Sequence, residues 1–317
     1  VAPAIAGLAD RLHDLARKNI YLGTSSWKYP GWLGQLYQPG GYNVRGKFSQ
    51  RKFDQTCLAE YARVFSTVGG DFSFYQFPTD EAWREIFAQV GPGFRLCPKV
   101  PEEITVERYP DMPRYGQRAG QPNPHFMDAA LFREKFLAPL APYRDKLGAL
   151  IFEFGTIHEG PYHEPRGFTR ALDQMLGDLP RGDFSYSVEV RNREFLKPGS
   201  GYLETLQSHS VAHCLNSWTR MPPLDEQMEV PNILTASHVA ARLLLRPGRS
   251  YEQAVKKFAP YDRVAEPYPE LRAALRRLIE ICKSSSKTLF VLVNNRLEGN
   301  AIETIAGSLD EIGTSQG

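Results

Sequence analysis

Hydrophobic residues along this chain follow two patterns that alternate with one another. Near the amino terminus Leu8, Leu12 and Leu15 are spaced three or four apart, which is typical of one face of an amphipathic helix. Beyond it, short apolar runs alternate with longer stretches of helical spacing. The short runs predict strands at 20–25, 71–75, 94–100, 147–154, 186–192, 211–218, 240–245 and 289–295. Helical spacing predicts helices at 79–90, 129–137, 168–176, 202–207, 269–282 and 302–309.

About eight strand-then-helix units, without an internal repeat or a low-complexity linker, predict a TIM-type (β/α)8 barrel. A doubly wound open sheet is the alternative. Against it, the first predicted strand is followed by Trp27, Tyr29 and Trp32 and not by a glycine-rich phosphate turn. We therefore expect an amino-terminal helix at 1–19, a single barrel domain at 20–313 and a flexible tail at 314–317.

Two long inserts interrupt this rhythm. The segment 38–55 is rich in glycine and basic residues, and the segment 101–124 contains five prolines and several arginines. Long loops in a compact domain are usually functional or mobile. Because each insert follows a predicted strand, both should lie at the carboxyl-terminal mouth of the barrel, where barrel active sites form.

Composition excludes several classes of function. The chain has 38 Lys+Arg against 36 Asp+Glu, a formal charge of +2, which does not favour a nucleic-acid-binding protein. The longest apolar run, 289–293, is far too short to span a membrane, and no secretory signal is visible, so we expect a cytoplasmic protein. The four cysteines are far apart and form no CxxC pair, which predicts neither a disulfide framework nor a zinc site.

Metal and cofactor motifs are also missing from the sequence. His158 and His163 lie close together after the fourth predicted strand, but in a loop-like segment without HExxH spacing. No GxSxG turn, P-loop or dinucleotide-binding fingerprint is present. We predict neither a metal nor a cofactor, and the oligomeric state cannot be read from the sequence.

Alternation along the predicted strand 186–192 points charged residues inward. Ser187, Glu189 and Arg191 share one face, and the other face is apolar and must meet the outer helices. Glu189 and Arg191 should therefore face the barrel interior near its mouth. They could hold an anionic or hydroxylated ligand. The alternative is an ion pair that merely fills the interior.

Similar reasoning selects further charged candidates. Lys99 ends a predicted strand and could bind an anion, or act as a base if it is desolvated. Glu153 lies within an apolar run, where a carboxylate is costly unless it faces the cavity. Asp71 and Tyr75 share a face of the second predicted strand. Two carboxylates near the mouth, from Glu153 and Glu189, would be the minimum for acid/base chemistry on a sugar.

Amide and aromatic side chains complete the candidate site. Asn294 and Asn295 end the last predicted strand, and one of them should face the cavity while the other lies at the strand–helix boundary. Asn216 lies near the end of the sixth predicted strand. The aromatic residues at 27–32 could stack on a sugar ring, or could equally form a hydrophobic lid.

Five motifs in succession resemble a known family. GTSSWKYPGW at 23–32, FYQFP at 74–78, FRLCPKV at 94–100, VEVRN at 188–192 and VNNRLEG at 293–299 occur in this order. Together they resemble the domain-of-unknown-function 72 (DUF72) family of α/β-barrel proteins over roughly residues 20 to 305. The resemblance implies a TIM-type barrel with a pocket at its carboxyl-terminal mouth and no established activity. The motif positions that it marks as pocket residues are Trp27, Tyr29, Trp32, Tyr75, Lys99, Glu189, Arg191, Asn294 and Asn295.

The chain departs from the family pattern at three places. Gly69, Gly70 and Asp71 stand where the family usually has Glu-Ile-Asn, so a usual pocket carboxylate is missing. Val106 replaces a common histidine. The arginine of the seventh-strand motif could be either Arg242 or Arg246.

Three functions remain open from the sequence. The first is a barrel enzyme, a hydrolase, lyase or isomerase, that acts on a small polar ligand, anionic or carbohydrate-like, with Glu189 as the base. The second is a non-catalytic metabolite-binding barrel that has lost a pocket carboxylate, as Gly69 suggests. The third is a divalent-metal-dependent isomerase or nuclease, which the scarcity of histidine at strand ends disfavours.

Overall fold

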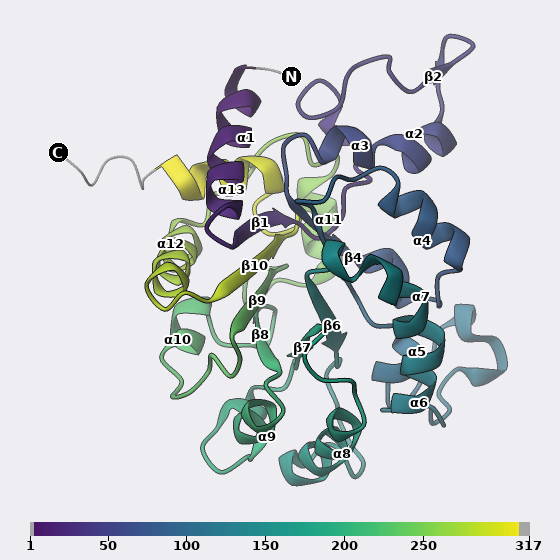
Figure 1. The fold of residues 1–317 in the computed structure, drawn as a ribbon, viewed down its shortest axis with the longest axis vertical. Helices are drawn as coiled ribbons and strands as arrows, with labels where there is room; N and C mark the ends of the chain where they lie inside the picture. The colour runs from purple at the N-terminus through teal and green to yellow at the C-terminus, as the bar shows by residue number, and fades with distance from the viewer. Residues whose placement is uncertain (1–2, 311–317) are drawn as a thin grey trace.

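The computed structural model describes residues 3–310, so the tail expected at 314–317 lies outside the described residues. Its main sheet contains eight strands in the order β5-β4-β1-β10-β9-β8-β7-β6, and every adjacent pair is parallel. The strands are β1 (Ile20–Thr24), β4 (Thr67–Gly70), β5 (Arg95–Pro98), β6 (Ala149–Glu153), β7 (Ser185–Glu189), β8 (Ala212–Ser217), β9 (His238–Leu243) and β10 (Thr288–Val293). Figure 1 shows them at the centre of the molecule.

The two ends of this strand order meet at β5 and β6. Isolated bridges join Leu96 to Leu147 and Lys99 to Ile151, and the amide of Val100 donates to the carbonyl of Ile151 at 2.9 Å. The sheet is therefore a nearly closed barrel, and the predicted (β/α)8 fold is confirmed.

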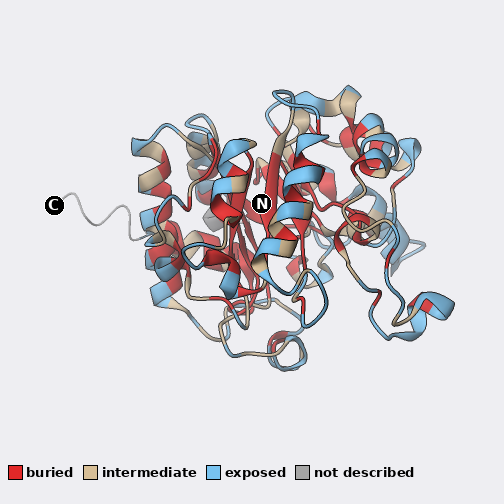
Figure 2. Ribbon diagram, turned by 90° about the horizontal axis from the view of Figure 1, so that it is seen from below, coloured by how far each residue is buried: buried red, intermediate tan, exposed pale blue. Residues whose placement is uncertain are grey.

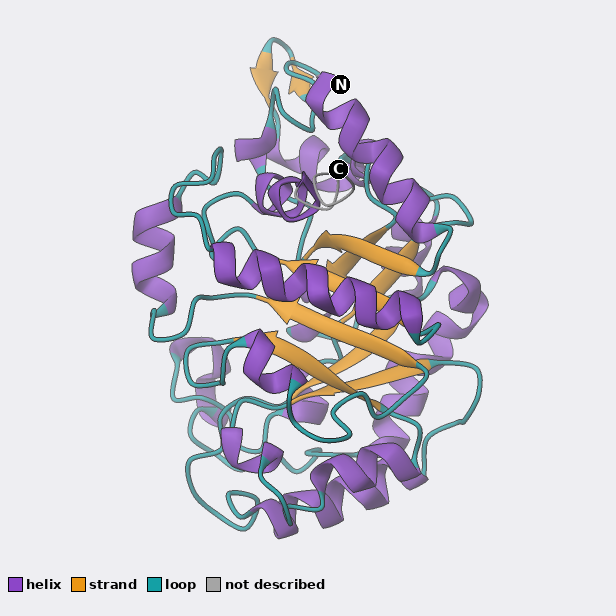
Figure 3. Cartoon of the chain, turned by 90° about the vertical axis from the view of Figure 1, so that its left-hand side faces the viewer, coloured by secondary structure: helices purple, strands orange, loops and turns teal. Residues whose placement is uncertain are grey.

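Helices surround the barrel, as the side view shows (Figure 3). The α-helices are α1 (Pro3–Ala16), α2 (Gln50–Thr56), α3 (Leu58–Tyr61), α4 (Asp80–Phe87), α5 (Glu102–Thr105), α6 (Ala129–Phe132), α7 (Ala138–Leu140), α8 (Pro165–Gly177), α9 (Tyr202–Ser208), α10 (Leu224–Met228), α11 (Tyr251–Phe258), α12 (Pro269–Ser284) and α13 (Ala301–Asp310). Shorter helical turns are η1 (Pro30–Trp32), η2 (Asp71–Phe74), η3 (Pro113–Arg118), η4 (Arg133–Leu137), η5 (Ala141–Lys146) and η6 (Arg193–Leu196). Several of the α-helices begin at a capping side chain. At the start of α4, for example, the hydroxyl of Thr79 accepts a hydrogen bond from the amide of Ala82 at 3.2 Å.

Side chains separate into two hydrophobic layers because successive strand residues point to opposite faces. Outward residues such as Leu150, Phe152 and Val188 belong to the large core between strands and helices. A smaller cluster, with Cys97, Ile151, Cys214, Phe290 and other residues, belongs to the opposite strand faces, inside the barrel. Apart from the first residues of β5, β7 and β10, the barrel strands are buried, while the outer faces of the helices are exposed (Figure 2).

The second barrel strand differs from the prediction. The strand is Thr67–Gly70, and the segment predicted as a strand at 71–75 begins with the turn η2. Glycine is depleted in strands and carries no hydrophobic signal, so the pattern did not predict a strand at Gly69 and Gly70. The aromatic residues after them are typical of strands, and the strand was therefore predicted there. Packing explains Gly69, because a Cβ there would lie 2.8 Å from the carbonyl oxygen of Ser25 on the neighbouring chain segment.

The other predicted strands are present with shifted ends. Residues 190–192 and 294–295 lie just beyond the ends of β7 and β10. The insert at 38–55 contains the hairpin of β2 (Asn43–Val44) and β3 (Lys47–Phe48), which projects from the body of the protein (Figure 1). The insert at 101–124 contains α5 and η3.

No helix formed by residues 3–310 combines the length and the apolar composition that a membrane span requires. Cys57, Cys97, Cys214 and Cys282 are all buried and all free.

Candidate functional site

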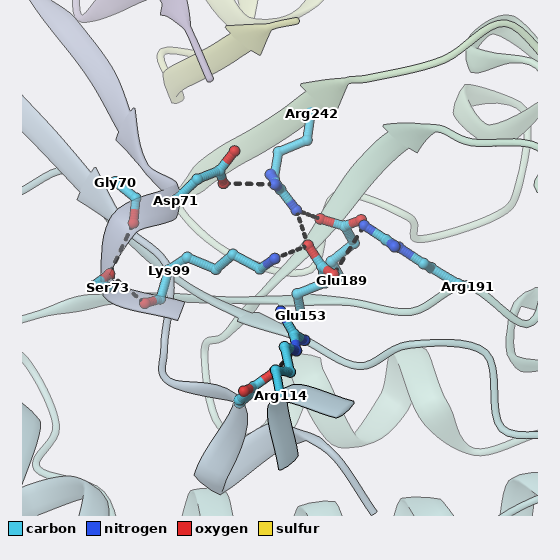
Figure 4. Close-up of polar contacts among 10 residues, drawn as sticks. Gly70, Asp71, Ser73, Lys99, Arg114, Glu153, Glu189, Arg191 and Arg242 are labelled. Carbon is cyan, nitrogen blue, oxygen red and sulfur yellow. Dashed lines mark hydrogen bonds and ion pairs between the residues drawn. The ribbon is translucent and has the colours of Figure 1, made fainter. Parts of the chain in front are cut away.

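Six charged side chains converge at the carboxyl-terminal end of the barrel (Figure 4). They come from β4, β5, β6, β7 and β9 or from the one or two residues after these strands, and we call them the mouth cluster: Asp71, Lys99, Glu153, Glu189, Arg191 and Arg242. Parallel strands bring their carboxyl ends to one face of the barrel, so residues far apart in the sequence meet there.

Glu153, the last residue of β6, is the centre of the cluster. Its Oε2 atom lies 2.6 Å from Nζ of Lys99 and 2.5 Å from Nη1 of Arg242. Its Oε1 atom lies 2.9 Å from Nη2 of Arg191. Both oxygens of this carboxylate are therefore occupied by cations.

Glu189, the last residue of β7, is held in a similar way. Nε of Arg191 lies 3.2 Å from its Oε1 atom, and Nη1 of Arg242 lies 2.5 Å from its Oε2 atom. The other terminal nitrogen of Arg242, Nη2, donates to Oδ1 of Asp71 at 3.0 Å. The cluster thus alternates three cations with three carboxylates, and their formal charges cancel.

Exposure within the cluster rises from its base to its rim. The side chain of Glu189 is 0% exposed and that of Arg242 is 4% exposed, whereas Lys99 is 10% and Asp71 is 35% exposed. Asp71 begins the turn η2, which Ser73 anchors by sharing its one hydroxyl hydrogen between the carbonyl oxygens of Gly70 and Lys99. A ligand entering from solvent would therefore meet Asp71 first.

Glu153 and Lys99 differ in how their surroundings affect their pKa values. Burial alone would raise the pKa of Glu153, but Arg191, Lys99 and Arg242 hold it far below its usual range, so this carboxylate stays ionised. Burial lowers the pKa of the Lys99 ammonium, and the attraction of Glu153 only partly offsets that effect. Lys99 is therefore the member of this pair that is better suited to give up a proton.

Aromatic rings lie against the cations of the cluster. Nζ of Lys99 is 3.4 Å from the ring centroid of Phe74, and the guanidinium carbon of Arg191 is 3.8 Å from the ring centroid of Trp218. Farther out, the guanidinium of Arg114 in η3 lies 4.8 Å from the ring of Tyr75, beside the cluster (Figure 4). These contacts fix the directions of the cations.

The asparagines occupy two different environments. Asn216 donates to the carbonyl of Val190 at 3.1 Å, and its Oδ1 atom is buried without a hydrogen-bond partner among residues 3–310. Asn294 continues the inward face of β10, and its Nδ2 atom likewise meets no acceptor within that described part. Asn295 accepts from the amide of Ala301 at 2.8 Å, at the start of α13, and its Nδ2 atom also has no partner among the described residues.

Other predicted site residues lie outside the mouth cluster. Trp32 is fully buried and contacts Tyr29 and a neighbouring tyrosine, and Trp27 is buried with its ring edge-on to Phe72. Neither offers a free face for stacking on a ligand. Tyr75 is 60% exposed, because the chain turns there and does not continue as a strand.

The choice between the two arginines of the seventh barrel strand is decided by geometry. Arg242 joins the mouth cluster, whereas Arg246 pairs with Glu266 at 2.7 Å. Sequence reasoning gave no role to Phe74 or Arg114. The sequence signal that could have indicated Phe74 is its place in the FYQFP motif. For Arg114, the signal is its place among the arginines of the 101–124 insert.

Metal ligands do not gather in this arrangement. Among residues 3–310, no group of three or more His, Cys, Asp and Glu side chains is placed to hold a metal ion. In the mouth cluster, each carboxylate faces a cation of the protein itself.

Comparison with known proteins relates this chain to proteins of unknown function. A family model described as "Protein of unknown function DUF72" matches residues 21–316. The UPF0759 protein YecE of Escherichia coli K12 is 29% identical over 183 residues, 57% of this chain and 51% of YecE. The match therefore spans about half the length of these curated relatives, which include YecE of E. coli O157:H7.

Solved structures support the fold. A DUF72 family protein from Enterococcus faecalis V583 has a TM-score of 0.63 and 16% identity, over 94% of this chain and 97% of that chain. A DUF72 family protein from Thermotoga maritima MSB8 has a TM-score of 0.60 and 16% identity, over 92% of this chain and 98% of that chain. At this identity the likeness concerns the fold alone.

Proposed function

The chain belongs to the DUF72 family of proteins of unknown function, and we propose that its barrel mouth binds a small hydroxylated, carbohydrate-like ligand and transfers a proton on it. The observation that carries this proposal is the composition of the mouth cluster. Three cations and three carboxylates alternate within hydrogen-bond distance of one another, and the most exposed member is a carboxylate, Asp71.

Charge balance favours a hydroxylated ligand over a simple anion. The ammonium and both guanidinium groups already have carboxylate partners, so an anion would have to displace one of them and leave a buried negative charge unpaired. A sugar hydroxyl can donate to a carboxylate and accept from a cation without changing the net charge. Asp71 on the rim, with one oxygen bound to Arg242, offers its second oxygen to such a hydroxyl.

Lys99 is the proton-transfer group in this proposal. Its lowered pKa brings the neutral amine closer to physiological pH, and a base is most effective when its pKa is near the operating pH. Glu189 is fully buried with both oxygens engaged by arginines, so we assign it to positioning Arg191 and Arg242 and no longer to the base. The guanidinium groups would stabilise negative charge that develops on a carbonyl oxygen of the ligand.

Reaction at the carbon next to a sugar carbonyl fits these groups. In its neutral amine form, Lys99 would take a proton from that carbon, and an enediolate would form between the two arginines. The resulting ammonium would return a proton to the former carbonyl carbon, while the proton of the adjacent hydroxyl moves to the former carbonyl oxygen, which gives the isomer. This sequence needs no redox partner and is balanced in protons, because each proton that Lys99 takes from the ligand is replaced by one from its ammonium group, which exchanges with solvent. The proposed activity is therefore that of an isomerase or epimerase.

A non-catalytic binding protein is the second candidate. Gly69 supplies no side chain where the family pattern usually has a pocket carboxylate, and the backbone at Ser25 fills the space beside it. Such a protein would bind the same ligand and leave it unchanged.

Deuterium exchange separates these functions. Neutral aldoses and ketoses, such as ribose, xylose and fructose, would be incubated with the protein in D2O and followed by proton NMR. We expect exchange at the carbon next to the carbonyl, slowed about 100-fold or more by Lys99→Met. Asp71→Asn should weaken binding. Lys283→Met, at an exposed ion pair with Glu280, is the matched control and should leave exchange unchanged.

Each other outcome has a clear meaning. Binding of a neutral sugar without exchange would favour the non-catalytic candidate. Binding of small carboxylates but of no neutral sugar would contradict the assigned ligand class.

A further inference from the structure

A second cluster of charge lies after β9 and is not balanced. Nη1 of Arg246 and Nη2 of Arg249 each lie 2.7 Å from Oε1 of Glu266, and Nζ of Lys257 in α11 pairs with Oε2 of the same carboxylate. Hydrogen bonds from Lys257 and Arg249 lower the pKa of Glu266 to about 2, so the carboxylate is ionised. Three cations share one anion, which leaves this Glu266 cluster with an excess of two positive charges.

Two guanidinium nitrogens of the cluster have no acceptor. Nε of Arg246 and Nη1 of Arg249 are buried atoms without a hydrogen-bond partner within residues 3–310. Buried donors are nearly always paired, so orphaned ones mark a place where an acceptor belongs. The guanidinium groups are held in place by rings, at 4.3 Å from the centroid of Tyr268 and 5.2 Å from that of Phe258.

The position of the Glu266 cluster in the fold is suited to a phosphate. β9 is the seventh strand of the barrel, and the loops after the seventh and eighth strands of (β/α)8 barrels frequently bind phosphate groups at the mouth. Arg246 and Arg249 belong to the loop after that strand. Guanidinium groups match the oxygens of a phosphate through paired hydrogen bonds.

Trp218 connects the two charged clusters. Arg191 of the mouth cluster lies over its ring, and the same tryptophan packs against the small apolar group formed by Leu245, Ala254 and Phe258. Arg249 and Lys257 in turn lie near the ring of Phe258. Trp218 is therefore the shared neighbour that a single ligand would span to contact both clusters.

We propose that the Glu266 cluster binds a phosphate monoester carried by the ligand of the mouth, so that the ligand is a small sugar phosphate. This inference rests on the proposed function for the identity of the sugar part. The balanced mouth cluster receives the neutral hydroxyls, and the excess positive charge of the Glu266 cluster receives the phosphate. The phosphate oxygens accept from the unpartnered nitrogens of Arg246 and Arg249 and from Lys257.

Nearby carboxylates limit where the phosphate can lie. Asp225 and Glu270 line a cavity of about 410 Å³ together with Arg246 and Tyr268, and they would repel an anion there. The phosphate therefore lies on the side of Arg249 and Lys257.

Calorimetric titration tests the proposal with three probes at constant ionic strength: ribose, inorganic phosphate and ribose 5-phosphate. We expect ribose 5-phosphate to bind at least tenfold more tightly than ribose. Lys257→Gln should weaken the binding of ribose 5-phosphate and of inorganic phosphate about tenfold and leave the binding of ribose unchanged. The fold should tolerate this change, because the side chain of Lys257 is half exposed. Lys257→Arg should restore most of the affinity.

Arg249→Gln is the second variant, and it should also weaken both phosphate probes. Arg277→Gln is the matched control, since it removes an arginine from an exposed ion pair with Glu229. A change of less than twofold for ribose 5-phosphate in Lys257→Gln would overturn the proposal. So would equal affinities of the unmodified protein for ribose and ribose 5-phosphate.

The two proposals fail separately. Binding of inorganic phosphate that Lys257→Gln abolishes, without any binding of ribose, would support the phosphate site and contradict the sugar site. If Asp71→Asn weakens the binding of ribose, and a phosphate group on the ribose adds no affinity, the sugar site is supported and the phosphate site is contradicted.

Discussion

The ammonium nitrogen of Lys99 lies 2.6 Å from Oε2 of Glu153, at the one junction of the described barrel where two neighbouring strands are joined only by isolated bridges. Both side chains are at least nine-tenths buried. The pair therefore joins β5 to β6 as well as forming the centre of the mouth cluster, so its two members should affect both stability and chemistry.

Removing the Glu153 charge should destabilise the protein strongly. Glu153→Gln leaves Lys99, Arg191 and Arg242 with one carboxylate fewer, and an uncompensated buried charge costs about 3–5 kcal/mol. The double variant Lys99→Met/Glu153→Gln should lose less than the sum of the single changes. Urea unfolding measures the stability of the two single variants and of the double variant. Losses that simply add would show that Lys99 and Glu153 do not interact. The control Glu280→Gln, at an exposed pair, should have no measurable effect.

Two buried histidines should make the protein less stable in mild acid. Burial lowers the pKa of His213 to about 3 and that of His238 to about 4, so neither takes up a proton in the folded state above that range. In the unfolded chain each titrates near its usual value of 6.5. Below that pH the unfolded state binds more protons, so stability falls as the pH falls towards 4.

The size of this acid effect can be measured by urea unfolding at two pH values. Between pH 7.5 and pH 5.5 we expect a loss of about 1.4 kcal/mol per histidine. His238→Gln should remove about half of the total loss. A pH dependence that is unchanged in this variant would show that other groups cause it.

Close contact between β1 and β4 should make Gly23 irreplaceable. A Cβ at this position would lie 2.1 Å from the carbonyl oxygen of Thr67, so Gly23→Ala forces the backbone of the two strands apart. We expect a loss of about 3 kcal/mol or more in thermal unfolding. Gly7→Ala is the control, since Gly7 is exposed in α1 with nothing within 4 Å of its added Cβ. It should stabilise the protein by about 0.5–1 kcal/mol.

Trp218 should report ligand binding by fluorescence. It is half-buried at the mouth, whereas the other three tryptophans, Trp27, Trp32 and Trp83, are buried. Acrylamide should therefore quench Trp218 selectively, and a ligand at the mouth should protect it. Trp218→Phe should abolish the response and Trp83→Phe should retain it. Protection that persists in Trp218→Phe would place the ligand elsewhere.

Local pattern predicted the fold class and part of the candidate site. The alternation of apolar runs indicated the barrel, and the two-residue period of a strand predicted inward faces for Glu189 and Arg191. The cost of a carboxylate within an apolar run predicted the same for Glu153. These features depend only on neighbours in the sequence, because burying an apolar face fixes which side chains turn inward. The second strand was mislocated because Gly69 and Gly70 carry no hydrophobic signal, although close packing requires them.

Only the tertiary structure decided which of these side chains meet. Arg242 and Arg246 differ by four residues, yet one completes the mouth cluster and the other pairs with Glu266. Trp32, selected for its aromatic ring, is buried in the core. Sequence determines the face on which a side chain lies, whereas the distances and the charge balance between strands depend on the closure and register of the barrel. That closure brings residues as far apart as Asp71 and Arg242 within 3.0 Å of each other.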